Sequence, residues 1–259
     1  DPQFQLALAG GVTSMQILPG SANLVGGRGV TLKNVGGRSV MDMKFPGAPY
    51  GLKMACGENP KRVYGGKGQA PMTRMGNVAG YRKSWIDAKE YMESWDEYEA
   101  GMGNGKPPKR DLRLESLAGV LRGEILIQNH CYRADEMMVM MEIAKEFDFK
   151  VTTFHHAVES YKIADKLAEN GVCSAMWSDW WGFKQEAYDM VPSNVALVDK
   201  AGACAVVHSD SATVIQHLNK EAAKAMASGN RLGMDITPAH AIKWITINAA
   251  KAIGVARDL

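Results

Sequence analysis

Residues 124–156 read EILIQNHCYRADEMMVMMEIAKEFDFKVTTFHH, and this stretch decides the fold class. Glu124–Gln128 is a short run rich in branched apolar residues and predicts a strand, and Lys150–Phe154 predicts a second strand. Between them, Ala134–Phe147 carries apolar residues at helical spacing and predicts an amphipathic helix. A strand, a helix and a strand in this order predict a parallel βαβ unit rather than a β-sandwich.

The same alternation continues on both sides of this unit. Upstream, Val12–Leu18 predicts a strand that leads into a glycine-rich segment. Gly26, Gly27 and Gly29 predict that this segment is flexible or lies close to a ligand. Downstream, the pattern predicts, in chain order, a helix at Val158–Asn170, a strand at Val172–Trp177, a helical stretch at Phe183–Lys200, a strand at Ala203–Val207, a helix at Val214–Ser228, and a final helix that begins at Thr237-Pro238 and covers Ile242–Val255. At 259 residues, the chain fits one α/β barrel or two small domains.

Composition excludes several classes of function. A formal net charge of +2 gives no basic excess for nucleic acid, and no run approaches the roughly 18 apolar residues that cross a bilayer. The glycine-rich segment is neither a P-loop nor a dinucleotide fingerprint.

The four cysteines are far apart in the sequence and form no CxxC, so buried free thiols are expected. Gly65–Pro108 carries one helical patch, Trp85–Tyr98, and is expected to be a partly mobile excursion.

Three potential metal ligands directly follow predicted strands. These are His130, the pair His155 and His156, and Asp210. The strand ends of an α/β barrel open on one face, so these residues are expected to converge there, where imidazoles and a carboxylate suit a zinc-type ion. Because neighbouring side chains alternate along a strand, one of His155 and His156 is expected to be structural. His208 competes with Asp210 as a ligand or supports it.

Two other interpretations remain open from the residues alone. A histidine that follows a strand is often a hydrogen-bonded structural residue. A metal-free enzyme using His130 or His156 as a general base is weaker, because no GxSxG elbow offers a nucleophile.

Five segments together resemble one family. They are GGVTSMQILPGSANLVGGRGVTLK (10–33), GLKMACGENPKRVYG (51–65), NHCYRADEM (129–137), HHAVESYKIADKLAENGV (155–172) and HSDSATVIQHLNKEAAKA (208–225). In this order they resemble the metal-dependent amidohydrolase superfamily, in its imidazolonepropionase-like branch. The resemblance runs over nearly all of the chain and implies a distorted TIM-type (β/α)8 barrel, with residues 1–259 as one barrel domain.

The resemblance also implies a chemistry. Relatives bind one or two divalent metals, usually zinc, and hydrolyse C–N bonds in amides, cyclic amides or peptide-like small molecules with a metal-bound hydroxide. Carried over, His130, His156 and Asp210 match metal ligands, and Asp210 also matches the residue that shuttles the proton. Lys53, carboxylated so that it offers two oxygens, is the expected bridging ligand, with Glu58 as its rival. Tyr132 and Arg133 are expected to contact the substrate, although an Arg133 that only caps the next helix is an equal alternative.

The sequence departs from the family at one motif. The 259 residues contain no HxH pair, and the first and last segments resemble points inside the family pattern, so the expected barrel is incomplete at its first strand and lacks the C-terminal sandwich segment. A catalytically incompetent fragment that acts as a scaffold or binds metal or ligand without turnover is therefore the alternative function. A homo-oligomer is a further expectation, and the compartment stays open between periplasm and cytoplasm.

Overall fold

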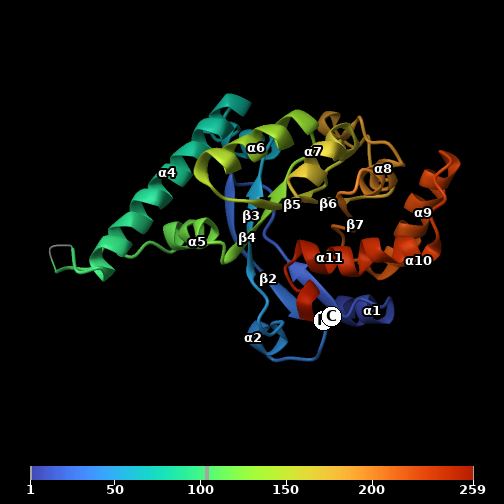
Figure 1. The fold of residues 1–259 in the computed structure, drawn as a ribbon, viewed down its shortest axis with the longest axis horizontal. Helices are drawn as coiled ribbons and strands as arrows, with labels where there is room; N and C mark the ends of the chain where they lie inside the picture. Colours follow the sequence, from blue (N-terminus) through green and yellow to red (C-terminus); the bar gives the residue numbers. More distant parts are fainter. Residues whose placement is uncertain (1, 103–104, 259) are drawn as a thin grey trace.

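A computed structural model describes residues 2–102 and 105–258 and shows an α/β fold built on a curled, mixed sheet (Figure 1). The strands are β1 (Ser14–Ile17), β2 (Val25–Lys33), β3 (Tyr50–Ala55), β4 (Ile125–His130), β5 (Val151–His155), β6 (Cys173–Met176) and β7 (Cys204–Val207), and they lie in this order across the sheet. From β3 to β7 all neighbours are parallel, whereas β2 is antiparallel to both β1 and β3. The parallel part therefore opens all its carboxyl ends on one edge.

In the residues that the structure describes, the sheet is a curled half-barrel, whereas the sequence predicts a (β/α)8 barrel that is incomplete at its first strand. Within residues 2–102 and 105–258, β1 and β7 form its two ends and do not pair with each other. The glycine-rich segment was expected to be flexible or close to a ligand, but most of it forms β2. Glycine is needed here for packing, because a Cβ on Gly29 would lie only 2.8 Å from the backbone carbonyl oxygen of Ile17.

The helices follow the predicted alternation, with shorter elements near the carboxyl end. They are α1 (Pro2–Ala9), α2 (Val40–Met43), α3 (Glu58–Gly65), α4 (Arg74–Glu99), α5 (Leu112–Leu121), α6 (Ala134–Phe147), α7 (Ala164–Glu169), α8 (Asn194–Lys200), α9 (Leu218–Arg231), α10 (Pro238–Ala241) and α11 (Ile247–Ala252). In Figure 1, α6, α7 and α8 lie along one side of the parallel strands and α11 along the other. The predicted helix at 134–147 is confirmed to the residue, and Thr237 caps α10 as expected. The stretch 183–200 is helical mainly at α8.

Helix α4 is longer than the helical patch predicted inside Gly65–Pro108. It begins at Arg74 rather than Trp85, and the Thr73 side chain caps it by accepting a hydrogen bond from the Gly76 amide. Gly76 and Gly80 in its first turns obscured the helical pattern. The segment does leave the sheet between β3 and β4, yet Tyr81, Trp85 and Ala88 are buried against the main core.

The cysteines are not free thiols: they pair as Cys56–Cys131 and Cys173–Cys204. Cys173 and Cys204 are register partners on β6 and β7, and the other pair follows directly after β3 and β4. Since these partners are 31 and 75 residues apart in sequence, the pairing appears only once the parallel strands are aligned. None of the described helices is both long and apolar enough to cross a bilayer.

Candidate active site

A cavity of about 1050 Å³ lies at the carboxyl edge of the parallel strands. Its polar end is lined by Lys53 of β3, His130 and Tyr132 at and after β4, His155 and His156 at β5, and His208 and Asp210 after β7. Its apolar wall is formed by Met15, Leu18, Ile215, Ile242 and Ile253, among others. Parallel pairing produces this convergence, because Ala55 faces His130 and His130 faces His155 in the register.

The imidazoles form a compact cluster. The His156 ring centroid lies 5.0 Å from that of His130 and 4.8 Å from that of His208. The Trp177 ring stacks against both His156 and His208, at 4.9 and 5.6 Å. The position of Trp177 at the end of a predicted strand indicates either a pocket wall or a core residue, and the structure places this indole against the two imidazoles.

Two turns with positive φ carry functional candidates into the cavity. His156 has φ 58° and Asp210 has φ 50°, values that are costly for residues other than glycine and that cluster at active sites. Nε2 of His156 and Oδ2 of Asp210 are 3.7 Å apart. His155, by contrast, places Nε2 2.6 Å from the Gln128 side-chain oxygen. Of the neighbouring pair, His155 is thus tied to the sheet and His156 faces the carboxylate.

The cavity keeps its imidazoles neutral. Burial lowers the pKa values of His130, His155 and His156 well below the usual range, and burial together with Lys53 lowers the pKa of His208 to about 3. Burial also lowers the pKa of Lys53 to about 8, against the raising effect of Asp210. The pKa of Asp210 is raised by burial and lowered in part by Lys53. Neutral imidazoles are the form that ligates metals.

The imidazole and carboxylate donors of the cavity are of the chemical type that binds a divalent metal, but they lie farther apart than the ligands of a bound ion. Nδ1 of His130, Nδ1 of His156 and Nε2 of His208 are buried without a hydrogen-bond partner, which is costly unless another group uses them. However, within the described ranges the His, Cys, Asp and Glu donors that lie within 4.8 Å of one another belong to Cys56, Cys131 and Glu136, not to the cavity. The cavity donors would have to close around an ion.

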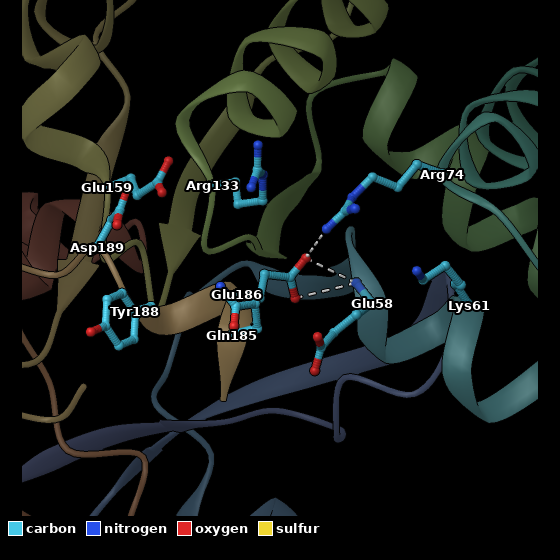
Figure 2. A pocket seen from close by; sticks show the side chains of 9 residues that line it. All are labelled: Glu58, Lys61, Arg74, Arg133, Glu159, Gln185, Glu186, Tyr188 and Asp189. Carbon is cyan, nitrogen blue, oxygen red and sulfur yellow. Dashed lines mark hydrogen bonds and ion pairs between the residues drawn. The ribbon is translucent and has the colours of Figure 1, made fainter. Parts of the chain in front are cut away.

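The structure separates the two rivals for the lysine position. The Lys53 side chain is buried and lines the cavity with the histidines. Glu58 begins α3 and lines a second pocket of about 360 Å³ (Figure 2). Its carboxylate lies 3.4 Å from Lys184 Nζ. Lys53 is therefore the better placed partner of His130 and His156.

The two expected substrate contacts lie in different pockets. Tyr132 lines the cavity, with its ring 4.5 Å from that of His130. Arg133 lines the second pocket (Figure 2). Its guanidinium pairs with Asp135 at 2.9 Å. Lys184 was not predicted, since it lies in a loop. Its Nζ donates to Asn59 at 2.8 Å and lies 4.2 Å from the Tyr132 ring centroid.

Comparison with known proteins identifies two relatives. The chain is similar to "Amidohydrolase tasK" of Hapsidospora irregularis, with 31% identity over 280 residues that cover 100% of this chain and 28% of that protein. It is also similar to a crystal structure of an amidohydrolase from Thermotoga maritima MSB8, with TM-score 0.87, 35% identity, and coverage of 99% of this chain and 64% of that one. Both of these homologues are named amidohydrolases, and this supports the assignment of the chain to an amidohydrolase family. No protein-family model matches the chain, and it spans less than two thirds of either relative.

Proposed function

We propose that this chain forms the active-site half-barrel of a metal-dependent hydrolase that cleaves C–N bonds of amides, cyclic amides or peptide-like small molecules. The observation that carries the proposal is the meeting of Lys53, His130, His156 and Asp210 from separate strands in one cavity. Two relatives named amidohydrolase support the reaction class, and the motifs that resemble the imidazolonepropionase-like branch supply the finer assignment.

In this proposal, His130, His156 and Lys53, the last as a carbamate with two oxygens, hold a zinc-type divalent ion with Asp210. When bound, such an ion polarises a carbonyl and makes water nucleophilic near neutral pH. Asp210 takes the proton of the attacking water at its carboxylate and passes it to the leaving nitrogen. Tyr132 and the apolar wall exclude water from the substrate's non-reacting part.

A second candidate is binding without turnover. It is favoured by the spacing of the donors, since His130, His156 and Asp210 do not lie mutually within 4.8 Å. The 259 residues also contain no HxH pair, the motif that holds a second ion in the family pattern. This candidate retains metal or ligand affinity and lacks hydrolysis.

Elemental analysis of the purified chain, together with hydrolysis assays on amide, cyclic amide and dipeptide substrates, tests both. We expect about one or two zinc-type ions per chain, lost in His130→Ala and in His156→Ala. His217→Ala is the matched control, because this exposed histidine lies outside the cavity lining. Metal with no hydrolysis would favour the second candidate. Unchanged metal in both cavity variants would contradict the ligand assignment.

A further inference from the structure

A carboxylate lies beside one of the two disulfides, and none of these three side chains lines the cavity of the proposed catalytic ligands. The sulfurs of Cys56 and Cys131 and a carboxylate oxygen of Glu136 all lie within 4.8 Å of one another. In the part of the chain that the structure describes, this is the group of potential metal donors that meets that spacing. Both cysteines are buried, at 3% and 0% exposure, and neither belongs to the cavity lining.

The fold itself assembles this group. Cys56 and Cys131 directly follow the neighbouring parallel strands β3 and β4, and the amide of Cys56 donates to the His130 carbonyl at 2.9 Å. Glu136 lies in the first turn of α6, which begins three residues after Cys131. Two strand ends and a helix start thus hold the three side chains together even if the S–S bond is absent.

The Glu136 carboxylate is held with one oxygen free. Arg74 Nε donates to Oε1 at 2.9 Å, while Oε2 is buried and has no hydrogen-bond partner. The neighbouring Glu186 is also buried and is held by Arg74 and by the Glu58 amide (Figure 2). Two carboxylates therefore share one guanidinium, and burial with Glu186 raises the pKa of Glu136 to about 7. A cation at Oε2 would relieve this repulsion and satisfy the orphaned oxygen.

We propose that reduction of the Cys56–Cys131 disulfide creates a zinc-type metal site formed by the two thiolates and Glu136. Thiolates and a carboxylate are zinc ligands, whereas the sulfurs of a disulfide are not in the form that binds the ion. Water would complete a four-coordinate shell, and the second pocket lies next to Glu136, since Arg74 lines this pocket and pairs with Glu136 at 2.9 Å. The site is closed when oxidised and open when reduced.

Reduction of the Cys56–Cys131 disulfide needs a two-electron donor. A water-soluble phosphine breaks the S–S bond and gives two electrons, and with one water it yields two thiols and the phosphine oxide. The divalent ion then displaces the two thiol protons to form two metal–sulfur bonds. This site does not depend on the proposed hydrolase function, because it uses none of Lys53, His130, His156 or Asp210.

The probe is cobalt(II) alone, added to the full chain after phosphine reduction and removal of the phosphine without air. Thiolate ligation gives a near-ultraviolet charge-transfer band that histidine and oxygen ligands in the cavity do not give. We expect the band in the reduced chain and no band in the oxidised chain. Glu136→Gln should keep the cysteines and weaken cobalt binding about tenfold or more.

The second disulfide provides the matched control. The pair C173S/C204S should keep the full band after reduction, since Cys173 and Cys204 lie outside the described donor group. The pair C56S/C131S should lose it, with circular dichroism reporting the fold. A band that persists in C56S/C131S, or that appears in the oxidised chain, would overturn the proposal. If C56S/C131S does not fold, unchanged affinity in Glu136→Gln overturns it instead.

Discussion

Asp210 combines a left-handed backbone conformation, a carboxylate close to His156 and a raised pKa. Its backbone has φ 50°, its carboxylate lies 3.7 Å from His156 Nε2, and burial raises its pKa while Lys53 opposes that rise. The left-handed turn at Asp210 brings its carboxylate toward His156. This position is consistent with the proposed role of Asp210 in holding and moving a proton.

We therefore expect Asp210→Asn to lower kcat by about 100-fold or more while metal content falls less than in His130→Ala. The amide keeps the size of the side chain but cannot accept the proton. Steady-state kinetics and elemental analysis on the same preparations measure the two effects. Full activity in the variant would exclude Asp210 as the proton carrier.

Arg133 supports a contrasting expectation. Its guanidinium is bound by Asp135 through two oxygens at 2.9 and 3.1 Å and lies in the second pocket. We expect Arg133→Ala to change KM less than about twofold and stability less than about 0.5 kcal/mol, as for other exposed residues. Tyr132→Ala, which alters the cavity wall, is the comparison. A large rise in KM for Arg133→Ala would restore the role in substrate binding predicted from the resemblance.

At the scale of the residue, the sequence predicts that the candidate side chains converge, but it does not predict how they face one another. His130, His156 and Asp210 were identifiable because they follow strands, and parallel pairing places such positions together. Which of His155 and His156 faces the carboxylate depends on the positive φ of His156, which no spacing rule predicts. Lys184 reaches the cluster from a loop whose conformation depends on tertiary packing.

At the scale of the element, α4 shows how a helix outside the sheet becomes part of the core. Trp85 has 0% exposure and its ring lies 4.2 Å from that of Phe149, while the next residue, Ile86, is 48% exposed. Sequence pattern found only the carboxyl-terminal part of this helix, because glycines interrupt its first turns. The residues that form its buried face are set by tertiary packing against the main core, which local sequence pattern does not reveal.

We expect Trp85→Ala to lower the free energy of unfolding by about 3–5 kcal/mol, because it removes a fully buried aromatic side chain and leaves a cavity. Ile86→Ala, one position along on the outer face, should cost less than about 0.5–1 kcal/mol. Urea unfolding followed by circular dichroism measures both. Equal losses in the two variants would show that α4 is not anchored through its inner face.

At the scale of the whole molecule, the order of the elements was predictable and the closure of the sheet was not. Alternating strands and helices predict parallel pairing from local pattern alone. Whether the sheet closes into a barrel depends on contacts between its first and last strands. At the first end of the sheet, β2 is antiparallel to both of its neighbours, so the strands there do not continue the parallel pattern. The two disulfides depend in the same way on strand alignment. The wide spacing of the cysteines in the sequence therefore predicts free thiols, although the folded chain brings them together in pairs.

A half-barrel whose cavity is lined by unpaired imidazole nitrogens should gain stability from an ion that satisfies them. With the disulfides oxidised and zinc at about 100 times its dissociation constant, mass action adds about 2.7 kcal/mol, which corresponds to a rise in Tm of roughly 5–10 °C for a chain of this size. Calorimetry with and without a chelator measures this rise. It should disappear in His130→Ala and persist in Glu136→Gln, because the oxidised cysteine group is closed to metal. A rise that survives in His130→Ala would mean that zinc stabilises the molecule from somewhere other than the cavity.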